Sequence, residues 1–198
     1  MMGSASWLCL FGLMASISGF AWVVGARASN TASRTYVLDS QKVPLEPGQT
    51  FSNLLVLPNL HPTYQFEIQL QFKVIRQYRG VGANPWESFW LFWGYNLDGA
   101  ERKKTNYILF KTNGLEIGKA SELTTQEFLW TGPEPKIIVG VWNDLVVAHR
   151  ESQLFLRLNG QIVKLDGLEL SKLYRYPGRI AFYAEDAKVL VRKFEIKF

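Results

Sequence analysis

The sequence predicts an all-β protein: an antiparallel two-sheet β-sandwich of jelly-roll type that follows an N-terminal apolar leader. Short segments of alternating apolar and polar residues succeed one another along the chain, and Gly, Pro, Asn and Asp separate them. No long stretch has the 3.6-residue period of a helix. A chain of 198 residues that is 47% hydrophobic is long enough for one domain with a core of its own.

The leader occupies residues 1–28 and has the features of a signal peptide. Trp7 to Ala26 form an almost uncharged apolar run, and Ala26-Arg27-Ala28 precedes Ser29 as a cleavage site would. The same run is long enough to span a bilayer as an uncleaved anchor. We expect an exported protein, secreted or periplasmic or at the cell surface, with residues 29–50 as a polar entry segment and residues 51–198 as the sandwich domain.

The clearest strand runs from Tyr64 to Val74, where every second side chain is apolar and the others are Gln, Glu or Lys. One or two helical turns are expected within residues 168–174, and the pairs Asn113-Gly114 and Asn159-Gly160 predict tight turns. Near Arg192 the apolar residues of the last strand change from odd to even positions in the sequence, and this change predicts a β-bulge there. Further strands are expected at residues 52–57, 89–95, 106–112, 115–120, 127–131, 137–141, 144–149, 153–158, 161–165, 179–184 and 188–198.

The stretch ESFWLFWGYN, residues 87–96, predicts a strand that is aromatic on both faces. Strict alternation places Phe89, Leu91, Trp93 and Tyr95 on one face and Ser88, Trp90 and Phe92 on the other. One face would pack between the sheets. The other would face a cleft or a covering loop, where aromatic rings are suited to stacking on a ligand.

Four segments, in order, resemble a known family. They are TNYIL at residues 105–109, VWND at residues 141–144, FLRLNG at residues 155–160, and GRIAFY at residues 178–183 ahead of the last strand. They are similar to motifs of the concanavalin A-like lectin/glucanase superfamily, in its laminin G-like and 3-keto-disaccharide hydrolase-like branches. The resemblance covers residues 66–198 and implies a curved sandwich whose concave sheet commonly binds carbohydrate. It also implies that Trp142 belongs to the core.

The catalytic strands of laminarinase-type glycosidases and of alginate lyases are absent from the sequence, so those two chemistries are not expected. Glu67 and Glu116 are the candidate catalytic carboxylates, and both are expected to point away from the core. His61 and His149 are the only histidines and have no zinc-site spacing. No cofactor is expected, although Asp98, Glu185 and Asp186 are candidates for a structural calcium site.

The candidate ligand-binding residues are aromatics that can stack on sugar rings and polar groups that can bind hydroxyls. They are Trp90, Trp93, Trp130, Gln69, Gln71, Asn96, Asn106, Lys111 and Arg157. We expect Glu67, Gln69 and Gln71 to lie in the same sheet as one aromatic face of residues 89–95. A polar floor beside a Trp wall would result.

Three functions remain open on the sequence alone. A glycan-binding module is favoured, because it needs only aromatics and hydrogen-bonding groups. A glycan-active enzyme of the 3-keto-glycoside type would need an acid, a base or a metal in the same cleft, and a laminin G-like adhesion domain would use loops at the rim. The 22 basic and 17 acidic residues leave a mild positive excess, and we expect no nucleic-acid partner. A membrane partner is expected only if the leader is uncleaved.

Overall fold

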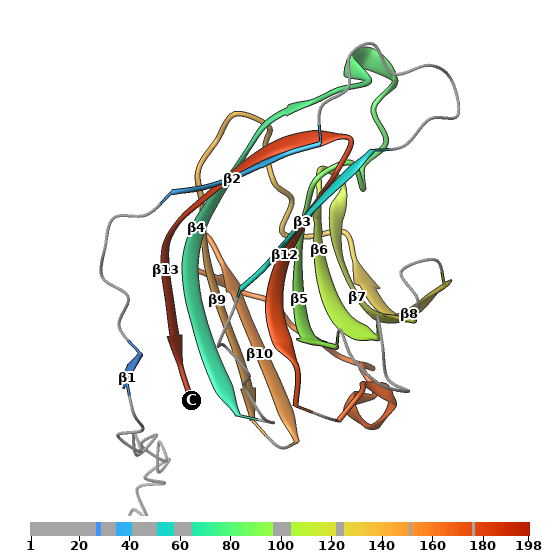
Figure 1. Cartoon of the computed structure of the whole chain (residues 1–198). Coiled ribbons are helices and arrows are strands. Elements are labelled where there is room, and N and C mark those ends of the chain that lie inside the picture. Colours follow the sequence, from blue (N-terminus) through green and yellow to red (C-terminus); the bar gives the residue numbers. More distant parts are fainter. Residues whose placement is uncertain are drawn as a thin grey trace, which may run out of the picture.

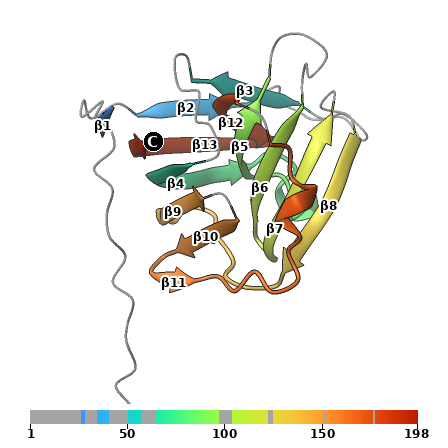
Figure 2. The same ribbon diagram turned by 90° about the horizontal axis from the view of Figure 1, so that it is seen from below.

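The computed structural model is a sandwich of two curved antiparallel sheets (Figures 1 and 2). It describes residues 27–28, 35–40, 51–57, 65–96, 104–121, 125–150, 152–175 and 177–198. The leader up to residue 26, His61 and Asp98 lie outside these ranges. Within them, no helix is long and apolar enough to cross a membrane. The predicted β-sandwich is confirmed.

The larger sheet has seven strands and forms the convex side. Its order is β1-β13-β4-β9-β10-β11, with β2 paired to β13. These strands are β1 (Arg27–Ala28), β2 (Tyr36–Asp39), β4 (Phe66–Gln77), β9 (Asn143–Arg150), β10 (Gln153–Leu158), β11 (Gln161–Ile162) and β13 (Ala187–Lys197).

The smaller sheet has six strands in the order β3-β12-β5-β6-β7-β8. They are β3 (Ser52–Val56), β5 (Phe89–Tyr95), β6 (Thr105–Lys111), β7 (Gly114–Ser121), β8 (Thr125–Gly132) and β12 (Arg179–Glu185). Figure 1 shows both sheets curving in the same sense, with β4 and β13 on the outside of the curve. The outer face of the six-stranded sheet is therefore concave.

The core fills the space between the sheets with the apolar side chains of alternate strand positions. From β4 come Phe66, Ile68, Leu70, Phe72 and Val74, all at most 4% exposed. Their partners from the six-stranded sheet include aromatic rings, so that the Phe72 and Phe89 centroids lie 4.7 Å apart. The period-two pattern that predicts the clearest strand also predicts its buried face.

Two irregular features agree with the sequence. The register shifts between Arg192 and Glu195, where Lys193 takes a φ of 51°, and this confirms the bulge predicted in the last strand. The short helical segment is a 3₁₀ turn, η3 (Leu170–Lys172), and a second one, η1 (Gly80–Gly82), follows β4.

The strand expected at residues 137–141 is wrong. Pro133 and Pro135 interrupt the chain before it, and Gly140 turns the backbone with a φ of 85°. Ile137 is buried, whereas Ile138, Val139 and Val141 are exposed, so burial does not alternate. The segment crosses between the sheets, with the Ile137 N–H donating to Lys111 O and the Gly140 N–H to Val74 O. The apolar run is therefore a crossover loop.

Candidate functional site

The concave face carries the second aromatic face of β5. Phe89, Leu91 and Trp93 belong to the core between the sheets, while Trp90, Phe92 and Tyr95 form a separate apolar cluster on the other side. Tyr95 changes face because Gly94, with a φ of 64°, lies in a bulge opposite Arg179–Ala181. The predicted double-sided strand is confirmed, but Tyr95 was placed on the wrong face.

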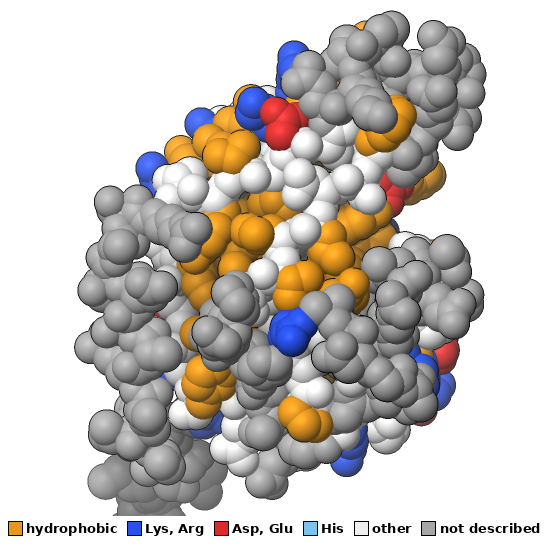
Figure 3. Space-filling view, viewed as in Figure 1, with side chains coloured by type: hydrophobic (Ala, Val, Ile, Leu, Met, Phe, Trp, Pro, Cys, Tyr) orange, Lys and Arg blue, Asp and Glu red, His pale blue; other side chains and the backbone are white. Residues whose placement is uncertain are grey.

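Neighbouring strands extend this cluster into an apolar floor across the middle of the concave sheet. Trp90 packs against Tyr107 of β6 with ring centroids 5.1 Å apart, and Phe92 stacks on Tyr183 of β12 at 5.3 Å. In the face shown in Figure 3, apolar side chains gather over β3 and β12, the first two strands of this sheet. Close packing of the rings makes the floor rigid.

A pocket of about 270 Å³ opens on this floor. Its lining residues are Trp86, Trp90, Leu109, Glu116, Gln126, Phe128 and Glu185. Trp90 is only 3% exposed, whereas Trp86 is 44% and Phe128 is 64% exposed. Stacking requires an accessible ring face, so Trp86 and Phe128 are the aromatic walls that a ligand can reach, and Trp90 supports them from below.

Glu116 forms the polar side of the pocket on β7. Its Oε1 accepts a hydrogen bond from the Tyr107 hydroxyl at 3.0 Å, and its Oε2 lies 3.1 Å from Lys111 Nζ. Burial, and then the charge of Glu116, raise the pKa of the Tyr107 hydroxyl, which therefore remains a donor at neutral pH. Lys111, a predicted ligand residue, contributes to the concave face through this ion pair, which orients Glu116.

Gly118 is required for this arrangement. A Cβ atom at this position would lie 2.5 Å from the Tyr107 hydroxyl oxygen and 2.4 Å from Glu127 O. Only glycine leaves room for the ring of Tyr107 beside β7, and the ring places its hydroxyl on Glu116.

Glu185 lies on the opposite side of the pocket, at the end of β12. Its Oε2 accepts a hydrogen bond from the Tyr183 hydroxyl at 3.1 Å. Burial raises the pKa of the Glu185 carboxyl. The nearby Asp186 and Glu87 charges raise that pKa further, whereas the Tyr183 hydrogen bond and the Arg79 charge lower it. The pocket therefore holds two carboxyl groups in different electrostatic surroundings.

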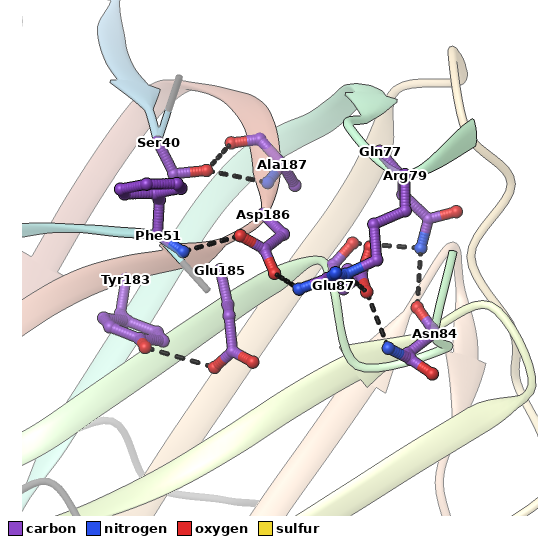
Figure 4. Close-up of polar contacts among 10 residues, drawn as sticks. All are labelled: Ser40, Phe51, Gln77, Arg79, Asn84, Glu87, Tyr183, Glu185, Asp186 and Ala187. Carbon is purple, nitrogen blue, oxygen red and sulfur yellow. Dashed lines mark hydrogen bonds and ion pairs between the residues drawn. The ribbon is translucent and has the colours of Figure 1, made fainter. Parts of the chain in front are cut away.

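A buried ionic network fixes the segment that carries Trp86 (Figure 4). Arg79 Nε bonds Glu87 Oε1 and Arg79 Nη2 bonds Asp186 Oδ2, both at 2.7 Å, and Asn84 Nδ2 donates to Glu87 Oε1. Asp186 also accepts from the Phe51 N–H at 2.6 Å. Because Glu87 and Asp186 are at most 1% exposed, this network ties the loop after β4 to the β12–β13 turn.

Three predicted polar residues lie on the other side of the molecule. Gln69, Gln71 and Arg157 line an open groove of about 440 Å³ on the convex face, and Gln71 Nε2 donates to Asp144 Oδ1 there. Glu67 belongs to the same face and pairs with Lys197. β4 and β5 are in different sheets, so the prediction that these groups share a sheet with residues 89–95 is wrong. Glu67 and Glu116 cannot act on one bond.

Other predicted site residues have structural roles. Trp93 is 4% exposed and packs in the core near His149, and Trp130 packs against the core from β8. Asn106 is fully buried, and its amide bonds both backbone groups of Tyr174. The Asn96 N–H donates to Lys104 O at the end of β5.

Trp142 was expected in the core, and this prediction is wrong. Its ring lies on the convex face beneath Arg192, whose guanidinium carbon is 3.8 Å from the ring centroid, and Lys73 lies 5.0 Å from it. The cations cover the ring, which explains why a large aromatic can lie outside the core.

Two of the three calcium candidates, Glu185 and Asp186, already have partners within the protein. Asp186 is engaged by Arg79 and the Phe51 N–H, and Glu185 by the Tyr183 hydroxyl. Across the part of the chain that the structure describes, no group of three or more His, Cys, Asp or Glu side chains is arranged to hold a metal ion.

Comparison with known proteins shows similarity in structure. No protein-family model and no curated protein matches the sequence. A carbohydrate-binding module, CBM66 from Bacillus subtilis, superposes with a TM-score of 0.58 at 8% identity, over 85% of this chain and 98% of that one. The fold is a β-sandwich similar to that of this module and of galectin-like proteins.

Two further solved structures have a similar fold. A protein of unknown function with a galectin-like fold, also from Bacillus subtilis, gives a TM-score of 0.54 at 13% identity over 74% of this chain and 77% of that one. Sheep galectin-11 in complex with glycerol gives 0.50 at 8% identity, over 72% and 95%. The fold implied by the sequence resemblance is confirmed, and at these identities the likeness concerns the fold alone.

Proposed function

We propose that this protein is an exported carbohydrate-binding protein that holds a glycan in the concave pocket. One observation carries the proposal: two exposed aromatic walls, Trp86 and Phe128, stand beside Glu116, Gln126 and Glu185 in a single pocket. Sugar rings present C–H faces that stack on aromatics and hydroxyls that bond carboxylates and amides. The structural similarity to a carbohydrate-binding module supports the same function.

The aromatic platform differs from the one that the sequence suggests. Trp86 and Phe128 make the stacking contacts, because their rings are accessible, and Trp90 forms the floor. Stacking on one ring contributes about 1 kcal/mol, by analogy with aromatic pairs. Two such contacts give weak binding of a short oligosaccharide, and tighter binding then requires a longer or multivalent glycan.

A glycan array, followed by titration of each bound glycan, tests the proposal. Trp86→Ala and Phe128→Ala should each weaken binding about fivefold or more. Phe155→Ala is the matched control, since Phe155 is an exposed phenylalanine on β10 of the convex sheet, 39% exposed. If a glycan binds and both folded pocket variants keep the wild-type affinity, the pocket is not the binding site.

A glycan-active enzyme is the second candidate, favoured by the presence of Glu116 and Glu185 in one pocket. Glycoside hydrolysis commonly uses two carboxyl groups that flank the scissile bond. Binding without turnover remains our first proposal, because both oxygens of Glu116 already accept hydrogen bonds. Mass spectrometry of a bound oligosaccharide decides between them. Turnover that is lost in Glu116→Gln while affinity is kept would establish the enzyme.

Export is the part of the proposal that rests on the leader. If the signal peptide is removed, the protein from the exported fraction should begin at Ser29. Intact-mass measurement checks this, and a full-length species extracted from membranes would instead establish an anchor.

A further inference from the structure

We infer that the concave pocket prefers a glycan that carries a protonated amino group, with Glu185 as the partner of the ammonium. This inference rests on the proposed glycan-binding function and specifies the class of sugar.

The lining of the pocket is negatively charged. It contains two carboxyl groups, Glu116 and Glu185, and no Lys or Arg is among its described lining residues. The charge of Glu116 is compensated by Lys111 at 3.1 Å. Among the described residues, Glu185 accepts a side-chain hydrogen bond from the neutral Tyr183 hydroxyl and has no ion pair of its own, so the uncompensated charge lies at the β12 side.

The surroundings of Glu185 strengthen this asymmetry. Glu87 and Asp186 are two further acids close to it, and the single guanidinium of Arg79 is bonded to both of them (Figure 4). Glu87 Oε2 is buried and accepts no hydrogen bond from the described residues. Three carboxyl groups therefore share one arginine, and a cation bound beside Glu185 would relieve their repulsion.

The aromatic walls suit the same ligand. An ammonium group is attracted to the face of Trp or Phe, and this attraction grows when water is excluded. Trp86 and Phe128 present such faces in the pocket that contains Glu185. The preference is local, because the whole chain has a formal net charge of +5 and would repel a cationic glycan elsewhere on its surface.

The experiment compares three β1→4-linked tetrasaccharides by calorimetric titration at about pH 6.5, where primary amines are protonated. The probes are the glucosamine, N-acetylglucosamine and glucose oligomers. We expect the glucosamine oligomer to bind about tenfold more tightly than the other two, as a charge-assisted hydrogen bond provides. Raising the salt concentration should reduce this preference.

Two variants assign the preference to one side chain. Glu185→Gln should bring the three affinities within about twofold of one another, and the exposed Glu134→Gln is the matched control that should keep the preference. Thermal unfolding of each variant confirms folding. Equal binding of neutral and amino oligomers by the wild type overturns this inference alone, as does a preference that survives in folded Glu185→Gln. No binding of any oligomer, together with a blank glycan array, overturns the proposed function as well.

Discussion

Replacing Asn106 separates a structural role from the ligand role that the sequence suggests. Asn106 Nδ2 donates to Tyr174 O at 3.0 Å, and Oδ1 accepts from the Tyr174 N–H at 2.8 Å. Asn106→Ala removes both bonds and leaves two partly buried backbone groups without these partners. At about 1 kcal/mol for each bond, with an added cost for unsatisfied groups, the free energy of unfolding should fall by about 2–3 kcal/mol.

Urea denaturation and calorimetry measure this loss. For a chain of this size the midpoint temperature should fall by roughly 5–10 °C. Asn113→Ala is the control, because Asn113 is exposed in the β6–β7 turn, and it should change the free energy of unfolding by less than about 0.5 kcal/mol. Asn106→Asp keeps the acceptor, but it places a carboxylate oxygen against Tyr174 O. Its deficit should therefore shrink at low pH, where the protonated acid can donate.

A loss for Asn106→Ala no larger than that for Asn113→Ala would refute the anchoring role. If stability is unchanged and glycan affinity falls instead, Asn106 is a ligand residue as the sequence predicts.

Three other predictions concern the walls of the pocket. Gly118→Ala should lower the free energy of unfolding by about 1–3 kcal/mol and weaken glycan binding, because the added Cβ would displace Tyr107. If denaturation gives the wild-type stability and titration gives the wild-type affinity, Gly118 does not lie as close to Tyr107 as the structure shows. Arg79→Met should lower the midpoint temperature much more than Lys136→Met. The first change leaves Glu87 and Asp186 buried without their cation, whereas the second removes the partner of the exposed Glu134. Similar shifts of the two variants in a thermal scan would be evidence against the network. The Glu185 carboxyl has a raised pKa when folded, so the stability that it contributes is complete below its usual value near 4.5 and is lost as the pH rises through the raised value. Glu185→Gln should accordingly gain stability relative to wild type from about pH 4.5 towards neutrality, and a difference that is constant over this range would show that the pKa is not raised.

Alternation along single strands was sufficient to predict most of the fold. Residues 64–74 show which side chains of β4 face the core, and the parity change near Arg192 shows that a bulge must follow. The failures are local. Gly94 reverses the face of Tyr95, and the prolines before Ile137 convert an apolar run into a crossover loop.

The candidate site was predicted less well, because alternation separates the two faces of a strand but does not say which sheet the strand joins. Gln69 and Trp90 both point outward, from opposite sheets. Phe128 and Trp130 are two residues apart, so strict alternation would place both side chains on the same face of the strand. The register shift opposite Ile117–Gly118 leaves Phe128 in the pocket and turns Trp130 towards the core. Trp86 precedes β5, so no period-two pattern predicts the direction of its side chain. The sequence shows only that a tryptophan follows Pro85 in a turn.

The most direct test of the concave pocket is the nuclear magnetic resonance signal of each indole N–H during titration with a bound glycan. Trp86, Trp90, Trp93, Trp130 and Trp142 are the tryptophans beyond the leader, and they sample the pocket, the core and the convex face. We expect the Trp86 signal to move most, with a smaller shift for Trp90 and none for Trp142. A shift of Trp142 with Trp86 unchanged would contradict the account and would place the glycan on the convex face.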